Sequence, residues 1–145
     1  MPRATFSHLA VAAASTEEVW ERLQLADTWA NIGPVEDVIE SVSREDGQLE
    51  SFVWTTTVAA KHYTGIAAVS DAVYGERMTL DLDAREVAGT LEAHLAPNGN
   101  GTTIVTVTLE VVSRGTLSTL FFPVVSEAVA RGLPSQVDEF AASLG

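Results

Sequence analysis

Residues 117–144 read LSTLFFPVVSEAVARGLPSQVDEFAASL, and apolar side chains recur in this stretch at steps of three and four residues. That spacing gives a helix one continuous apolar face. The apolar series keeps its phase through Gly132 and Pro134, which would otherwise mark breaks. The stretch therefore predicts one long helix with kinks, or two nearly coaxial helices.

The region before this helix carries strand patterns. Apolar and polar residues alternate over 78–83, 90–95 and 105–111, as half-buried strands require. Asp46-Gly47 and Asn98-Gly99-Asn100-Gly101 are strong hairpin signals, because these residues tolerate the positive φ angles of tight turns. The short spacing predicts consecutive antiparallel pairing. Further strands are predicted over residues 35–44, 49–60 and 63–72.

The first residues predict a strand followed by a helix. The strand covers Thr5–Ala13, and its alternation is expected to turn Leu9 and Val11 inward. Ser15 is a good helix N-cap, and Glu18 three residues later completes a capping box. The order is thus strand, helix, about six antiparallel strands and a long helix. A curved antiparallel sheet needs one face covered, and the last helix is the only element large enough to cover it.

Composition limits the class of protein. The chain has 145 residues, of which 46% are hydrophobic and 19% charged, as in a single globular domain over residues 1–145. A net charge of −12 argues against nucleic acid or an anionic membrane as the main partner. The lack of cysteine excludes a disulfide framework and a thiol nucleophile. No apolar run reaches the roughly 18 residues that span a bilayer, and we expect a cytoplasmic protein.

Several motifs resemble those of a known superfamily. They are the strand at 9–13, the helix start Ser15-x-x-Glu18-Val19-Trp20, Trp29 before the Gly33-Pro34 break, and the last helix ending near Phe140. On these motifs the chain resembles the helix-grip proteins, the SRPBCC superfamily of START, Bet v 1 and polyketide cyclase proteins. The resemblance covers nearly the whole chain. It implies an α+β fold in which a curved antiparallel sheet of about six to seven strands wraps around a long C-terminal helix.

Within this superfamily a second set of motifs is similar to the carbon monoxide dehydrogenase G-like proteins. The motifs are Tyr63-Thr64-Gly65, Glu76-Arg77-Met78-Thr79-Leu80, Gly89-Thr90-Leu91-Glu92-Ala93 and Gly101-Thr102-Thr103. They are turns, strand pairs and packing positions, so they specify the fold better than any chemistry. Members of the superfamily bind lipids, sterols, polyketides and plant hormones, and some are cyclases or dehydratases.

A sheet wrapped on a helix commonly leaves an internal apolar space that accepts small molecules. Trp29 and Trp54 are candidate ligand contacts, since an indole can stack on a flat ligand, whereas Trp20 is better explained by core packing. The same residues would fill a solid core if no cavity exists. The other predicted wall residues are Phe52, Met78, Leu80, Leu91, Val107, Phe121 and Val125.

Few polar groups are expected inside such a cavity. Thr56, Tyr63 and Tyr74 are the candidates on inward faces, and His62 beside Tyr63 is the best histidine for acid–base work. The three histidines lie on separate segments without metal-ligand spacing, so we expect no metal and no cofactor. No serine-nucleophile elbow or phosphate loop occurs, so no catalytic residue is assigned.

Three functions remain open. The first is binding or transport of a small hydrophobic ligand, such as a lipid, a polyketide or an aromatic compound, in the internal cavity and without catalysis. The second is an enzyme of the polyketide cyclase or dehydratase type, which needs polar groups that converge inside the cavity. The third, implied by the resemblance to the dehydrogenase G-like proteins, is an accessory protein that recruits or matures a larger enzyme through its acidic surface. A homodimer is open as well.

Overall fold

The computed structural model describes residues 3–30, 32, 35–58, 61–84, 87–113 and 116–144. The elements follow the order strand, helix, six strands, helix, with a short 3₁₀ helix, η1, after the first helix. Their bounds are β1 (Arg3–Ala12), α1 (Thr16–Leu23), η1 (Ala26–Trp29), β2 (Asp37–Ser43), β3 (Leu49–Val58), β4 (Lys61–Val73), β5 (Arg77–Ala84), β6 (Val87–Pro97), β7 (Thr103–Ser113) and α2 (Thr116–Ser143).

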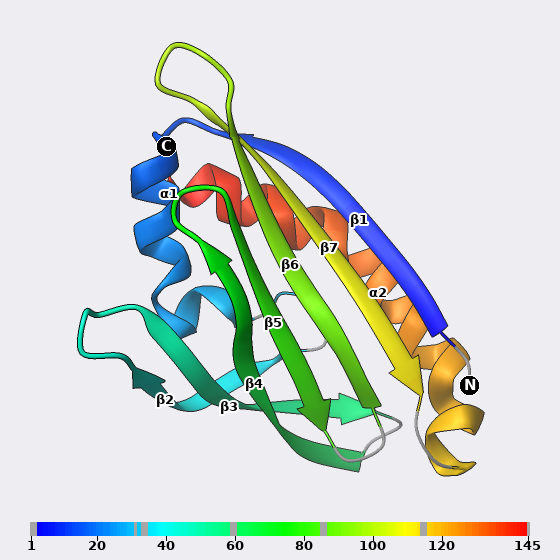
Figure 1. The fold of residues 1–145 in the computed structure, drawn as a ribbon. Coiled ribbons are helices and arrows are strands. Elements are labelled where there is room, and N and C mark those ends of the chain that lie inside the picture. The colour runs from blue at the N-terminus through cyan, green and yellow to red at the C-terminus, as the bar shows by residue number, and fades with distance from the viewer. Residues whose placement is uncertain are drawn as a thin grey trace.

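The described strands form one curved antiparallel sheet of seven strands in the order β1-β7-β6-β5-β4-β3-β2. Strands β2 to β7 pair as successive neighbours, and β1 pairs with β7, so β1 and β2 are the two edges. Helix α2 runs along one face of the sheet and lies chiefly against β1 (Figure 1). The predicted α+β arrangement, a sheet wrapped around the last helix, is confirmed.

Helix α1 begins as the sequence predicts. The hydroxyl of Ser15 accepts a hydrogen bond from the backbone N–H of Glu18 at 3.2 Å, and the Glu18 carboxylate accepts one from the Ser15 N–H at 3.4 Å. At its other end, side chains of η1 bind the last carbonyls of the helix. Thr28 Oγ1 donates to the carbonyl oxygen of Arg22 at 2.6 Å, and η1 is thereby fixed against the end of α1.

Helix α2 is one helix of 28 residues that runs through Pro134, so the prediction of one long helix, rather than two coaxial helices, is correct. Its described inward side chains include Leu133 and Val137, which are at most 1% exposed. The apolar spacing read from the sequence therefore marks the face that packs on the sheet.

The inward face of β1 differs from the prediction. Leu9 and Val11 are 53% and 51% exposed, so the expectation that they point inward is wrong. The face turned to α2 carries Ala10 and Ala12 instead, which are at most 8% exposed. Their small side chains let the helix backbone come close to the strand. His8 lies on the same face, with Nε2 2.9 Å from a carboxylate oxygen of α2.

Rows of apolar side chains cross the inward face of the sheet. Leu80, Leu91 and Leu109 lie opposite one another on β5, β6 and β7, and each is fully buried. A neighbouring row joins Met78 on β5 to Val107 on β7 through an alanine on β6. These rows form the floor on which the candidate site is built. No described helix is long and apolar enough to cross a bilayer.

Candidate ligand-binding site

The predicted wall residues lie together on the inward face of the sheet and on η1. Those whose side chains are described are at most 2% exposed and belong to one hydrophobic cluster: Trp29, Phe52, Trp54, Met78, Leu80, Leu91 and Val107. Phe121 and Val125 are on α2, outside the residues whose side chains the structure describes. The described wall residues come from η1 and from strands β3, β5, β6 and β7.

The three tryptophans differ in what their indole N–H groups bind. Trp20 Nε1 donates to Gln48 Oε1 at 3.2 Å, and Trp29 Nε1 donates to the Leu23 carbonyl oxygen at 3.0 Å. The Trp54 side chain is fully buried, and its N–H has no acceptor. It is the one buried side-chain donor or acceptor without a partner in the described part of the chain. Buried polar groups are nearly always paired, so this N–H is an exception that needs an explanation.

The position of the Trp54 ring depends on Gly65. The two residues face each other across the β3–β4 pair. A Cβ atom at position 65 would lie 2.7 Å from Cε2 and Cζ2 of Trp54 and 2.8 Å from Cβ of Ala84. The missing side chain therefore makes the space that the nitrogen-bearing edge of the indole occupies.

We expect Gly65→Ala to lower the free energy of unfolding by about 1–3 kcal/mol, because the added methyl group overpacks a filled part of the core. Urea unfolding followed by tryptophan fluorescence measures the loss. In a Trp54→Phe background the smaller ring should recover part of it. An equal loss in both backgrounds would show that the indole is not the obstacle.

Two predicted polar groups gather beside Trp54. Thr56 lies two residues further along β3 on the same face and is 6% exposed. Tyr63 lies opposite Thr56 on β4 and is half-buried. We call Trp54, Thr56 and Tyr63 the polar corner. It is the place on the described inward face where side chains that can hydrogen-bond are brought together by adjacent strands.

Other predicted polar residues lie elsewhere. His62 is exposed on the outer face, with Nδ1 3.1 Å from Thr57 Oγ1, so the structure does not bring it into the polar corner. Tyr74 is 64% exposed at the β4–β5 turn, and the expectation that it faces inward is wrong. Its ring centroid lies 5.7 Å from that of Trp20, so the two aromatic rings pack together at this turn.

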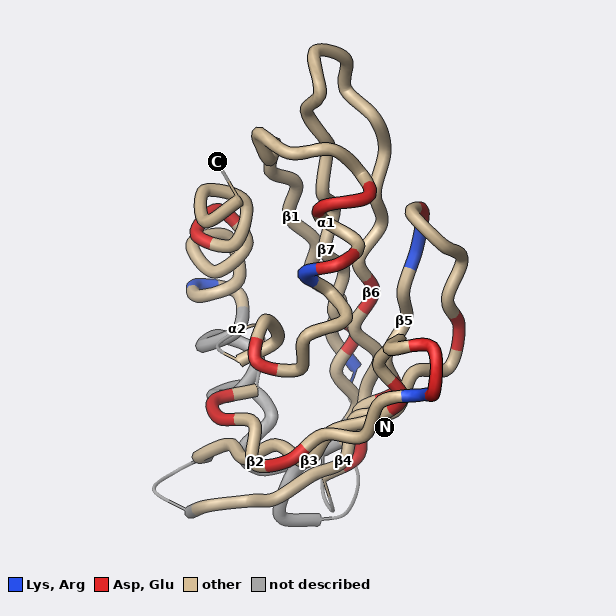
Figure 2. Tube along the Cα trace, turned by 90° about the vertical axis from the view of Figure 1, so that its left-hand side faces the viewer, with Lys and Arg blue, Asp and Glu red and all other residues tan. Residues whose placement is uncertain are grey.

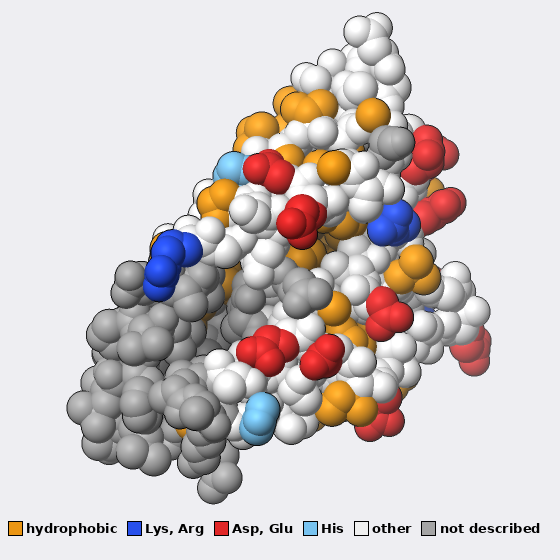
Figure 3. Space-filling view, turned by 180° about the vertical axis from the view of Figure 1, so that it is seen from behind, with side chains coloured by type: hydrophobic (Ala, Val, Ile, Leu, Met, Phe, Trp, Pro, Cys, Tyr) orange, Lys and Arg blue, Asp and Glu red, His pale blue; other side chains and the backbone are white. Residues whose placement is uncertain are grey.

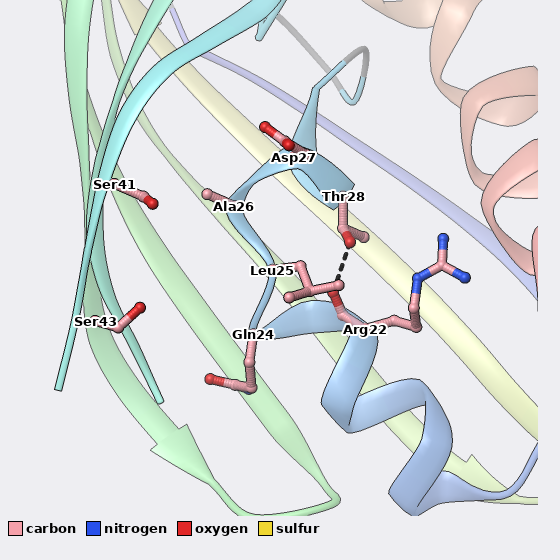
Figure 4. A pocket seen from close by; sticks show the side chains of 8 residues that line it. All are labelled: Arg22, Gln24, Leu25, Ala26, Asp27, Thr28, Ser41 and Ser43. Atoms are coloured by element: carbon pink, nitrogen blue, oxygen red, sulfur yellow. Dashed lines mark hydrogen bonds between the residues drawn. The ribbon is translucent and has the colours of Figure 1, made fainter. Parts of the chain in front are cut away.

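Two polar depressions, lined by described residues, border η1. The larger, of about 530 Å³, lies between η1 and β2, where Ser41 and Ser43 face η1 (Figure 4). The smaller, of about 220 Å³, lies between η1 and the end of α2 and includes Ile32 and Phe140. Arg22 borders both, and its side chain points toward α2.

These depressions form a polar rim beside the apolar interior. Seen from behind, apolar side chains are visible inside a recess near the middle of the view, and acidic side chains lie at its borders (Figure 3). Arg22 Nη2 lies 3.3 Å from Ser143 Oγ, which links α1 to the end of α2. The rim was not predicted from the sequence, because residues 22–28 and 41–43 meet only through the tertiary fold.

Acidic residues are spread over helices and strands rather than gathered on one element (Figure 2). Among the described residues no group of three or more histidine, aspartate or glutamate side chains is placed to hold a metal ion. Thr56 and Thr103 are the buried polar residues of the described part, and Thr103 Oγ1 donates to the Ala14 carbonyl oxygen at 2.7 Å. The described interior therefore offers hydroxyl and indole groups rather than ionised ones.

Neither a family model nor a curated protein matches this chain. Solved structures do. A START superfamily protein from Mycobacterium smegmatis is 14% identical with a TM-score of 0.72, covering 97% of this chain and 99% of that one. The Zhui aromatase/cyclase from Streptomyces sp. R1128 is 18% identical with a TM-score of 0.67, covering 94% and 92%. Norcoclaurine synthase from Thalictrum flavum is 15% identical with a TM-score of 0.62, covering 99% and 86%.

Proposed function

For a chain with the helix-grip fold of the START superfamily, we propose binding or transport of a small hydrophobic molecule on the inward face of the sheet, as a carrier rather than as an enzyme. A lipid, a polyketide or an aromatic compound has the required chemistry. The wall would consist of the seven buried predicted residues described above, with Phe121 and Val125 contributed by α2.

One observation carries the proposal. Helix α2 makes most of its contacts with the edge strand β1 and fewer with its neighbour β7. It also contacts β3, which lies toward the opposite edge of the sheet. The middle strands, which it approaches less, present small residues between the large apolar ones: Ala67 on β4 and Ala93 on β6. A helix supported at both sides of an arched sheet, above small side chains, favours an internal space of the kind that holds ligands.

The inward face also favours binding over catalysis. Its described buried residues include no histidine, carboxylate, lysine or arginine. General acid–base chemistry needs a group that exchanges a proton near neutral pH. A carrier needs only apolar area and a few orienting polar atoms, which the polar corner provides.

Thermal unfolding in the presence of fatty acids, naphthols and flat polycyclic aromatics tests this proposal. A ligand present at one hundred times its dissociation constant should raise Tm by about 5–10 °C. Ala67→Leu, which adds bulk to the inward face, should reduce that rise. The matched control is Ala68→Leu on the exposed outer face, which should keep it. No rise with any compound, together with an experimental structure whose core is solid, would rule the proposal out.

The polar corner keeps a cyclase or dehydratase as a second candidate, because the Thr56 and Tyr63 hydroxyls could orient a polyketide carbonyl. Turnover of a linear polyketide that is lost in Thr56→Val and Tyr63→Phe would support it. Turnover that persists in both variants would contradict it.

The accessory-protein interpretation, and the similarity to the dehydrogenase G-like proteins behind it, stay predictions from the sequence. A pull-down at low and high salt tests them, since an acidic surface should release its partner as salt rises.

A further inference from the structure

Another hollow lined by described residues, of about 290 Å³, lies away from the cavity face and is used by none of the functions proposed above. It opens between α1, the β2–β3 turn and the β4–β5 turn, which packs beside α1 (Figure 1). We call it the hairpin pocket, and it lies at the opposite end of β3 and β4 from the polar corner. We propose that the hairpin pocket binds an aromatic amino acid as its zwitterion, with the ring against Tyr74, the carboxylate at Arg44 and the ammonium group at Asp46.

The apolar part of the hairpin pocket has a buried floor and an accessible ring. Trp20, Leu49 and Met78 form the floor and are at most 2% exposed, so a ligand reaches little of them. Tyr74 also lines the pocket, is 64% exposed and rests on the floor, with its ring centroid 5.7 Å from that of Trp20. An accessible ring supported in this way can pack against a ring supplied by a ligand. A space of 290 Å³ holds roughly ten water molecules, which suits a compound with one ring better than a lipid chain.

The polar part of the hairpin pocket consists of side chains with hydrogen-bonding capacity to spare. Arg44 and Asp46 are both exposed, and neither forms an ion pair among the described residues. Asp46 Oδ1 accepts from the backbone N–H of Gln48 at 3.0 Å, which orients the carboxylate and leaves Oδ2 for a ligand. Gln48 Oε1 accepts from Trp20 Nε1, so the NH₂ group of the Gln48 amide remains to donate. The pocket therefore offers a guanidinium group, a carboxylate and an amide donor.

The two opposite charges in the pocket favour a ligand that carries both. A monoanion at Arg44 would also meet the Asp46 carboxylate, in a protein whose net charge is −12. A monocation at Asp46 would meet the Arg44 guanidinium. A zwitterion pairs with both side chains and adds no net charge. The two charged groups of an amino acid share one carbon atom, and Arg44 and Asp46 are two residues apart in one turn, so both can be contacted together.

Three probes with the same phenyl ring separate the two charges: L-phenylalanine, 3-phenylpropanoate, which lacks the ammonium group, and 2-phenylethylamine, which lacks the carboxylate. Calorimetric titration at pH 7 should show L-phenylalanine binding about tenfold more tightly than either of the others, because each of them loses one charge-assisted contact. In ¹H–¹⁵N spectra the indole proton of Trp20, in the floor of the pocket, should shift on binding. The indole proton of Trp29, which does not line the pocket, should not.

Two variants remove the charges one at a time. Asp46→Asn keeps the oxygen that accepts from Gln48, and its affinities for L-phenylalanine and 3-phenylpropanoate should agree within about twofold. Arg44→Gln should bring the affinities for L-phenylalanine and 2-phenylethylamine within about twofold. Glu45→Gln is the matched control, because it removes a charge from the same turn without lining the pocket, and it should keep the full preference.

The inference does not rest on the proposed function, whose test with Ala67→Leu concerns the inward face of the sheet. It would be overturned by a wild-type protein that does not bind L-phenylalanine or binds the three probes equally, or by a preference that survives in either variant. A shift of the Trp29 resonance in place of the Trp20 resonance would also overturn it, because the ligand would then lie in the interior. The three exchanged residues are exposed, so the variants are expected to fold, and the wild-type affinities and resonances decide the question if one does not.

Discussion

Gly89→Ala is expected to lower the free energy of unfolding by about 3 kcal/mol or more, at the upper end of overpacking effects. Gly89 lies on β6 opposite Val111 of β7. A Cβ atom at this position would overlap the backbone carbonyl oxygen of Glu110. A side chain can rotate away from a new methyl group, whereas this oxygen belongs to the neighbouring strand and can move only if the β6–β7 pairing is distorted.

Gly132→Ala is the matched control for this prediction. The same methyl group added to α2 would meet the Gln136 side chain at 3.5 Å, an ordinary contact. Alanine is also the better helix former, so we expect stability to rise by about 0.5–1 kcal/mol. Urea unfolding of both variants by circular dichroism measures the opposite signs. A Gly89→Ala protein within about 1 kcal/mol of the wild type would contradict the close approach of the two strands.

Trp29→Phe is expected to lower the free energy of unfolding by about 2–4 kcal/mol. The substitution removes part of a fully buried ring and leaves a void. It also removes the donor to the Leu23 carbonyl oxygen at the end of α1. A buried acceptor left without its partner adds about 1–3 kcal/mol to the cost.

Trp54→Phe separates these two contributions. It removes the same atoms from a ring that is equally buried, but its N–H has no protein partner to lose. We therefore expect Trp54→Phe to be about 1–3 kcal/mol less damaging than Trp29→Phe when no ligand is present. Equal losses, measured by urea unfolding at one protein concentration, would show that the Trp29 hydrogen bond contributes nothing.

The fold was predictable where neighbouring residues decide the structure. The capping box at Ser15 and Glu18 needs only residues three apart, and the alternating strands need only their own sequence. The inward face of β1 was not predictable in this way. Leu9 and Val11 are the larger apolar residues, yet Ala10 and Ala12 face α2. Contact with α2, from the far end of the sequence, decides which face of β1 turns inward, and that contact requires small side chains.

The candidate site, too, could be predicted where neighbouring residues decide the structure and not where distant segments meet. The alternation of residues along β3 is enough to predict that Phe52, Trp54 and Thr56 share the inward face, and all three are buried. Sequence could not show that Trp29 has a hydrogen-bond acceptor and Trp54 has none, because the path of η1 decides that the Trp29 N–H reaches the backbone oxygen of Leu23 on α1. The polar rim around Arg22 was not predicted either, since its larger depression forms only when α1, η1 and β2 are brought together by the fold.

The pairing of β1 with β7, and its cover by α2, have a consequence for biosynthesis. Strands β2 to β7 join through short connections and can form one hairpin at a time. Residues 3–12 find their partner only when residues 103–112 have been made, and the apolar face stays in contact with water until the last 28-residue helix docks. A ribosome that has not yet released this helix holds an aggregation-prone intermediate, for which chaperone capture and aggregation compete with completion of the fold.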